Sequence, residues 1–193
     1  MKILIIFLTF SFLLLAQSKD FNNQSMKVDN KSLIPLKVGN CWYNKRIEFN
    51  RDGSNSKIKL DSIYIKKDTT INSKYGYFFS TDPNSIFYQD SVGLWVYIVN
   101  TKENSLFLKY PCAINDSWKV SISDINGNII VKNLNEVVRI EDKTYKCIHY
   151  ELRNESGQNS DIFVKPSIGF IKVILYKDNY KNMEVKLINF KLK

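Results

Sequence analysis

The sequence predicts an all-β domain of roughly twelve antiparallel strands. From Trp42 onward, short segments rich in Ile, Val, Tyr and Phe alternate between apolar and polar residues, and the gaps between them hold Asp, Asn, Gly, Ser and Pro. No window sustains an apolar helical stripe over three turns. Alternation with short gaps and no intervening helices indicates pairing between sequence neighbours, which is antiparallel.

The expected strands can be placed individually. They cover residues 42–49, 57–65, 75–80, 85–90, 93–99, 105–110, 117–123, 129–140, 144–152, 161–165, 169–176 and 183–192. Turns are expected at 50–56, 81–84, 125–128 and 141–143, where Asp, Asn, Gly or Pro gather. So many strands exceed what an open twisted sheet carries comfortably. The alternatives are a strongly curved sheet forming a half-barrel, a closed barrel, or a sandwich, and the sequence does not choose among them.

The N-terminus has the layout of a secretory signal peptide. Lys2 precedes an apolar run from Ile3 to Ala16, and small residues at Ala16 and Ser18 have the spacing of a cleavage site. The run is shorter than the roughly 20 residues that a transmembrane helix needs, so no retained membrane anchor is expected. We therefore expect a signal peptide at 1–18, a mobile polar leader at 19–32, and a single β domain at 33–193, secreted or periplasmic.

Two similar segments begin strands about seventy-five residues apart. Pro35–Trp42 (PLKVGNCW) and Pro111–Trp118 (PCAINDSW) share the Pro, a turn-forming pair and the Trp at the end. Pro cannot donate to a sheet ladder, Gly39–Asn40 and Asn115–Asp116 turn the chain, and the Trp is the first large side chain of the next strand. Each segment is interpreted as a strand entry that delivers an aromatic anchor into the core. The alternative is that the Trp residues line a ligand cleft.

The charge of the chain does not indicate nucleic-acid binding. The formal net charge is +9, but it comes from 24 Lys and only 4 Arg, scattered among 21 Asn. Sequence-reading proteins cluster Arg for bidentate contacts. The remaining expectation is a surface that attracts anionic material such as lipid headgroups or acidic polysaccharide, so that the partner is a lipid or another envelope component.

Few residues have side chains suited to catalysis or metal binding. His149 is the single histidine, and Cys147, His149 and Glu151 share one strand face, a spacing at which side chains could hold a metal. A lone His on a strand is more often a core or surface residue, so no metal site, cofactor or catalytic residue is assigned. The three cysteines, Cys41, Cys112 and Cys147, allow at most one internal disulfide or else three free buried thiols.

The order of several segments resembles a group of secreted or cell-envelope β-proteins of Bacteroidetes-like bacteria. The matching segments are PLKVGNCW (35–42), VGLWVYIV (92–99), SLFLKYPCAINDSW (105–118), KTYKCIHYEL (143–152) and KPSIGFIKV (165–173), and together they span nearly the whole mature chain. Asn115 and Lys143 stand where the group usually has Gly. The resemblance implies an antiparallel envelope protein similar to curved-sheet lipoprotein carriers, with no known reaction and no functional residues to transfer.

Three functions remain. The first is a non-catalytic carrier of an apolar or amphipathic ligand, with Trp42, Trp95 and Trp118 as candidate ligand-binding residues. The second is an envelope interaction module that offers strand edges to partners. The third is a hydrolase that uses two carboxylates. A cavity, a bare sheet edge or a carboxylate-lined cleft would favour the first, second or third respectively.

Overall fold

The protein is described by a computed structural model that covers residues 32–122 and 125–193. Within these two ranges every regular element is a strand, and no helix there is long and apolar enough to cross a membrane. The signal peptide expected at 1–18 and the leader expected at 19–32 lie outside the described residues, apart from Ser32.

Twelve strands form one antiparallel sheet, as the alternation predicts. They are β1 (Cys41–Phe49), β2 (Asn55–Ile71), β3 (Lys74–Phe79), β4 (Asp82–Gln89), β5 (Gly93–Ile98), β6 (Asn104–Lys109), β7 (Ser117–Ile122), β8 (Ile125–Ile140), β9 (Lys143–Asn154), β10 (Ser160–Lys165), β11 (Gly169–Lys177) and β12 (Tyr180–Lys191). The order across the sheet is β6-β5-β4-β3-β2-β1-β12-β11-β10-β9-β8-β7.

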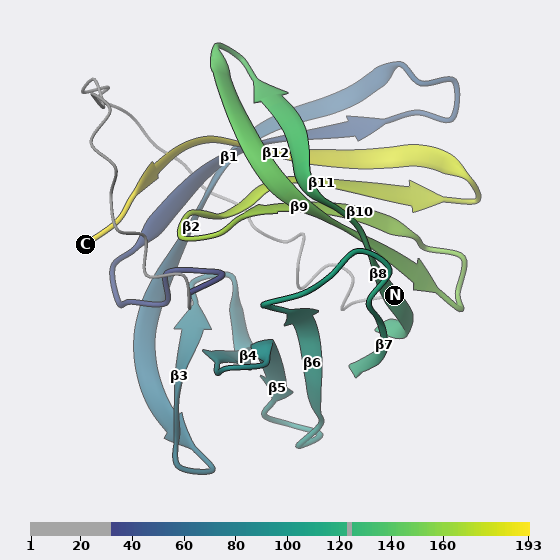
Figure 1. Cartoon of the computed structure of the whole chain (residues 1–193). Helices are drawn as coiled ribbons and strands as arrows, with labels where there is room; N and C mark the ends of the chain where they lie inside the picture. Colours follow the sequence, from purple (N-terminus) through teal and green to yellow (C-terminus); the bar gives the residue numbers. More distant parts are fainter. Residues whose placement is uncertain (1–31, 123–124) are drawn as a thin grey trace.

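The sheet consists of two six-stranded meanders and curls into a nearly closed barrel (Figure 1). The first meander runs from β1 to β6 and the second from β7 to β12, and a continuous β1–β12 ladder joins them. The two free edges, β6 and β7, come together on the other side of the barrel. Of the three architectures that the sequence left open, the structure is therefore closest to the barrel, without a backbone ladder between β6 and β7.

Each meander begins with the same turn, and the two Pro-to-Trp segments form these turns. Gly39 donates its backbone N–H to Ile65 on β2, and Asn115 donates to Val131 on β8, both at 2.9 Å. Gly39 and Asn115 have φ of 88° and 70°, a region that Gly and Asn tolerate best. The repeat is thus a strand-entry device, as its residues predict, and it starts both halves of the barrel.

Two expected turns lie mostly within strands. Of residues 81–84, only Thr81 is in a turn, because β4 already begins at Asp82. Residues 125–128 were expected to turn the chain, but Ile125 already begins β8 and pairs with Ile122. Gly127 lies within the strand opposite Asn154, where a Cβ would come within 2.1 Å of the Arg153 carbonyl oxygen. This glycine therefore permits close packing of β8 against β9 and does not mark a turn.

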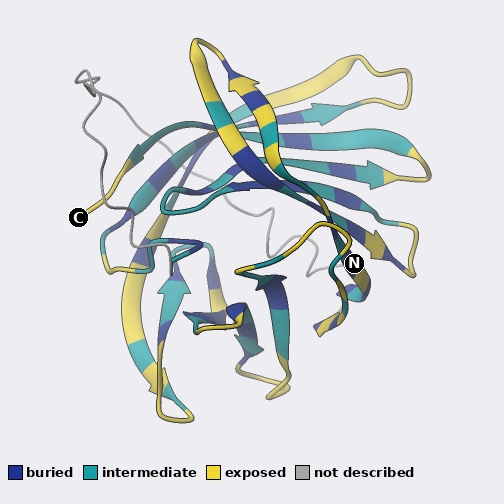
Figure 2. Cartoon of the chain, viewed as in Figure 1, coloured by how far each residue is buried: buried dark blue, intermediate teal, exposed yellow. Residues whose placement is uncertain are grey.

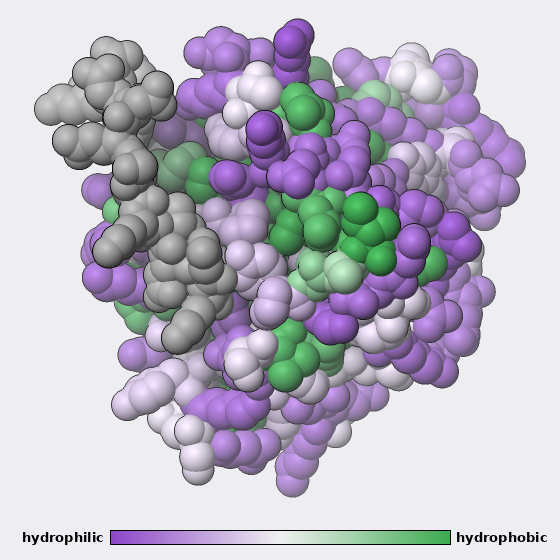
Figure 3. All heavy atoms as spheres, viewed as in Figure 1, coloured by the Kyte–Doolittle hydropathy of each residue, from purple (hydrophilic) through white to green (hydrophobic). Residues whose placement is uncertain are grey.

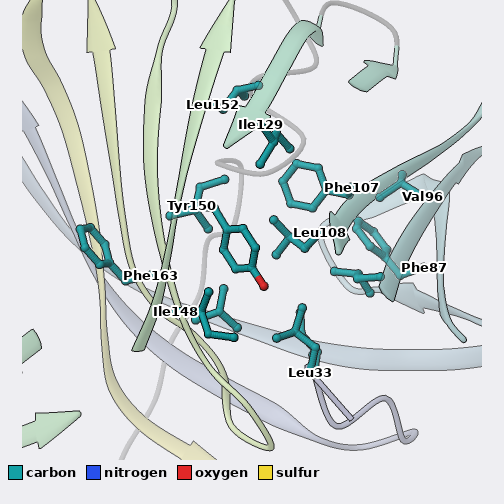
Figure 4. Close-up of a cluster of buried hydrophobic side chains, with 14 of the residues drawn as sticks. Leu33, Phe87, Val96, Phe107, Leu108, Ile129, Ile148, Tyr150, Leu152 and Phe163 are labelled. Atoms are coloured by element: carbon teal, nitrogen blue, oxygen red, sulfur yellow. The ribbon is translucent and has the colours of Figure 1, made fainter. Parts of the chain in front are cut away.

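The core lies inside the barrel, and the hairpin tips are exposed (Figure 2). Tyr150 on β9 is completely buried and lies among side chains from both meanders, including Phe107 and Leu108 of β6 (Figure 4). Leu33 and Ile34, which precede the first turn, are buried as well, and their backbone N–H groups donate to Gln89 at 3.1 and 3.0 Å. The chain before β1 therefore packs into the same core.

Side chains bridge the seam between β6 and β7. The Trp118 indole N–H donates to the Leu106 carbonyl at 3.2 Å, and the Ser121 backbone N–H donates to the Ser105 hydroxyl at 3.3 Å. The Tyr150 hydroxyl donates to the Lys109 carbonyl at the end of β6, at 2.9 Å. These contacts replace the backbone ladder that joins β1 to β12.

Replacing Tyr150 by Phe tests the seam. The substitution keeps the ring but leaves the Lys109 carbonyl without the hydroxyl, so the free energy of unfolding should fall by ~1 to 3 kcal/mol. Urea unfolding measures the change, and Tyr75→Phe is the control because Tyr75 is 75% exposed. Equal stability of the two variants would show that the hydroxyl does not hold the seam.

Candidate functional site

Two small cavities adjoin one another inside the barrel. The larger has a volume of about 50 Å³ and is partly open to solvent, and the smaller has a volume of about 30 Å³. Asn44, Ile63 and Phe170 line both, so the cavities meet at these residues. The remaining lining of the larger cavity comes from both meanders: Phe107, Ile125, Leu152, Ser160, Ile162, Ile171, Lys172, Val173, Leu175, Val185 and Leu187.

Part of the cavity wall is apolar yet incompletely buried. Ile63, Phe170, Val173 and Val185 are only half-buried, although they lie within the barrel. Val173 and Val185 are opposite one another in the β11–β12 ladder, so they form one patch of the wall. Covering such a wall is favourable by about 25 cal/mol per Å² of apolar surface. The free protein therefore keeps an apolar surface that a nonpolar group can cover.

Two polar side chains interrupt this apolar lining. Asn44 on β1 is 4% exposed and Ser160 at the start of β10 is 3% exposed. The Asn44 Nδ2 and the Ser160 Oγ have no hydrogen-bond partner among the residues that the structure describes. Register places both inward, because Asn44 lies opposite Leu187, and Ser160 lies opposite Leu152 and Leu175, which all line the cavity.

A charged strip continues along β1 and β2 from Asn44. Asp61 lies opposite Asn44 in the ladder and is 1% exposed. The Arg46 Nε is 3.6 Å from the Asp61 carboxylate and 3.8 Å from the Glu48 carboxylate. Lys59 lies opposite Arg46 and Lys57 lies opposite Glu48 in the same ladder, so the strip holds three cations and two anions, and Asp61 is the charged residue directly opposite Asn44.

The three tryptophans, proposed together as ligand-binding residues, do not meet in one cleft. Trp42 is 5% exposed and lines the smaller cavity, and its indole donates to the Ile168 carbonyl at 2.5 Å. Trp95 donates to Asp90 at 2.9 Å, and Trp118 belongs to the seam. Neither Trp95 nor Trp118 lines the two cavities. A ligand role for Trp42 remains a proposal, while the geometry gives Trp95 and Trp118 other contacts.

The side chains of Cys147, His149 and Glu151 have different environments. Cys147 is fully buried, and burial raises the pKa of its thiol to about 12. The His149 Nε2 is 2.8 Å from the Asp161 carboxylate, and Glu151 forms ion pairs with Lys132 and Arg153, both at 3.1 Å. Across residues 32–122 and 125–193, no group of three or more His, Cys, Asp or Glu is placed to hold a metal.

The cysteines are all free. Cys41 and Cys112 are half-buried, and in both residues burial raises the pKa of the thiol. Because the thiolate is the reactive form, these three residues are poor nucleophiles. The sequence left open whether two of the cysteines form a disulfide. In this structure they are three separate thiols.

A polar surface pocket of about 220 Å³ brings two carboxylates together. Glu151 and Asp161 are opposite one another on β9 and β10 and line this pocket. Burial alone would raise both pKa values, but hydrogen bonds lower them, from Arg153 and Lys132 to Glu151 and from His149 and Tyr176 to Asp161. Both groups are therefore ionised at neutral pH. Carboxylate-based glycoside hydrolysis needs one protonated acid, so this pocket does not favour it.

Comparison with known proteins finds solved structures that match most of the chain at low identity and a TM-score below 0.5. No family model matches the chain, and no curated protein matches it. A crystal structure of a Bacteroides fragilis protein, predicted to be exported and with a YmcC-like fold, has a TM-score of 0.47 and 10% identity, covering 84% of this chain and 100% of that one. A predicted lipoprotein from Parabacteroides distasonis has a TM-score of 0.44 and 14% identity, covering 83% and 99% respectively. At this identity and TM-score, the similarity gives no information about the ligand or activity of this protein.

Sequence reasoning missed the polar residues of the cavity, although β1 holds a signal for them. Trp42, Asn44 and Arg46 are two residues apart, so a strand places them on one face. Once Trp42 is taken as a core residue, Asn44 and Arg46 must also face inward. Ser160 offers no such signal, because it begins its strand.

The outer wall of the barrel carries a cluster of charge around Glu184 on β12. Lys172 and Lys186 lie 3.1 and 3.0 Å from the Glu184 carboxylate, and Lys181 forms a further ion pair with it. Burial would raise the pKa of Glu184, but the hydrogen bonds and charges of the lysines outweigh it and lower the pKa to about 2.

Elsewhere on the surface, apolar side chains gather near the middle of the face in Figure 3.

The Glu184 cluster predicts a loss of stability in acid. Because the folded pKa is about 2 and the ordinary value is 4.5, this contribution is complete above about pH 5 and disappears as the pH falls towards 2. Its size at neutral pH is on the order of 3 kcal/mol. In urea unfolding between pH 7 and pH 3, Glu184→Gln should show a shallower decline than the wild type. Parallel declines would contradict the assignment.

Proposed function

We propose that the protein is a non-catalytic carrier, located outside the cytoplasm, that holds the apolar part of a small ligand inside its barrel. The observation that carries the proposal is the half-buried apolar wall formed by Ile63, Phe170, Val173 and Val185 around a partly open cavity. Ligand sites are typically concave, mostly apolar, and equipped with a few polar groups, and this cavity has each property.

The size of the cavity limits what fits. Its volume of about 50 Å³ is smaller than the ~150 Å³ of an engineered cavity that binds benzene, although it adjoins a second cavity of about 30 Å³. The space suits a short alkyl segment, with the rest of the molecule extending through the opening. The ligand is therefore best described as amphipathic, with only a short segment of its alkyl chain inside the barrel.

The other two functions have less support. The β6 and β7 edges face each other and are joined by the Trp118 and Ser121 hydrogen bonds, so a partner strand would have to displace these contacts to pair with either edge. The pocket of Glu151 and Asp161 holds two ionised carboxylates and lacks the acid that a hydrolase of this type needs. A carrier remains the function that the geometry favours.

Filling the cavity should weaken binding. Val185→Phe places a ring into the larger cavity, so its affinity for 1-octanol should fall at least about tenfold, while Val137→Phe, at a site that is 59% exposed, should bind as the wild type does. Isothermal titration calorimetry at two temperatures measures affinity and the negative heat-capacity change that marks apolar burial.

Overpacking can itself destabilise a core by ~1 to 3 kcal/mol, so thermal unfolding of each ligand-free variant is measured first. Val173→Leu, which adds a single methylene at the facing position, serves as a milder second variant. A folded Val185→Phe protein that binds 1-octanol with wild-type affinity would contradict the proposed site.

Export is the second part of the proposal, and it is supported by Lys2 and the apolar run from Ile3 to Ala16. The mature protein should begin near Lys19. Mass spectrometry of the intact protein from its source organism measures this, and a chain that still begins at Met1 outside the cytoplasm would contradict cleavage.

A further inference from the structure

Asn44 is the most unusual residue of the cavity. It is 4% exposed, it lines both cavities, and its Nδ2 lacks a hydrogen-bond partner within the described part of the chain. Leaving a buried amide unsatisfied is unfavourable, and an apolar residue of the same size would remove the penalty. A polar group that weakens the free protein in this way is expected where a ligand provides the missing partner.

A second buried donor faces the same cavity from the opposite meander. Ser160 is 3% exposed, and its Oγ also has no partner in residues 32–122 and 125–193. Asn44 belongs to β1 and Ser160 to β10, and both line the larger cavity. The polar atoms of the cavity thus come from two separate walls. A hydroxyl donates and accepts, whereas the amide nitrogen of Asn44 donates, so the ligand must present at least one acceptor oxygen.

The charges beside the cavity restrict that acceptor further. Asp61 lies directly opposite Asn44, and Asp61 and Glu48 both lie near the single guanidinium of Arg46. A ligand carboxylate beside Asn44 would lose its hydration in a low-dielectric interior and would lie close to the buried carboxylate of Asp61. A neutral oxygen, such as an ester or amide carbonyl or a hydroxyl, avoids this repulsion.

We propose that Asn44, assisted by Ser160, binds the neutral oxygen of an alkyl ester, amide or alcohol, so that the cavity selects such compounds over the corresponding free acids. The proposal rests on the carrier function and specifies its ligand class. The alkyl segment occupies the apolar cavity, and the neutral polar group lies at Asn44, where the two cavities meet.

The test compares three probes of one chain length by isothermal titration calorimetry: 1-octanol, methyl octanoate and ionised octanoate. The wild type should bind the alcohol and the ester about tenfold or more tightly than octanoate. Asn44→Leu should bind the alcohol and the ester ~3 to 10-fold more weakly, which is the contribution of one neutral hydrogen bond. The ligand-free Asn44→Leu protein should also melt at a higher temperature than the wild type.

Asn135→Leu is the matched control, because Asn135 is exposed on β8 and lies away from the cavity lining. It should change neither affinity nor selectivity. Ser160→Ala is the second variant and should weaken binding of the same two probes in the same direction. Because the comparison of ester with acid uses the wild type alone, it decides the selectivity even where Asn44→Leu does not fold.

The outcomes separate the two proposals. Octanoate binding as tightly as methyl octanoate, or full affinity in a folded Asn44→Leu protein, overturns the ligand class while the carrier function stands. Failure of all three probes to bind removes the carrier function and this inference with it.

Discussion

Closure of the barrel at the β6–β7 seam is the constraint on which the interior depends. The two meanders share a full backbone ladder at β1–β12, whereas at the opposite junction Trp118, Ser121 and Tyr150 span the gap with side-chain contacts. Without that junction the sheet would be an open curved surface, and Phe107 and Tyr150, which meet in the core, would belong to separate walls. Antiparallel sheets twist and curl, but side chains must complete the closure where edge strands are short.

The closed interior is not packed uniformly. Aromatic and branched side chains fill most of it, yet Asn44, Arg46 and Asp61 lie on the inner face of β1 and β2 beside a small cavity. Buried polar groups are unfavourable unless they are paired, and a fully apolar strand would make a more stable barrel. Such departures from an ideal core are expected at functional sites. The buried polar side chain of Asn44 is therefore stronger evidence for a ligand site than the volume of the cavity.

The basic composition has a structural use. Lys172, Lys181 and Lys186 surround one buried carboxylate on the outer wall, and other lysines pair singly with Asp or Glu, as Lys109 does with Asp116 at 2.8 Å. Part of the positive charge is therefore held in local ion pairs, which differs from the clustered Arg-rich surface that nucleic-acid recognition favours.

The sequence by itself determined the local structure: strand number, antiparallel pairing and the two Pro-to-Trp entries follow from period-two alternation and turn residues, which act within a few positions of one another. It misjudged Gly127, because a glycine needed for close strand packing looks the same as a turn glycine until the partner strand is known. Whether the strands made a barrel, and whether Trp42, Trp95 and Trp118 met, depended on contacts between residues far apart in the chain, such as Trp42 with Ile168. The cavity also depends on contacts between distant residues. Asn44 and Ser160 line one cavity only after the two meanders have curved around it, and no local sequence pattern encodes that curvature.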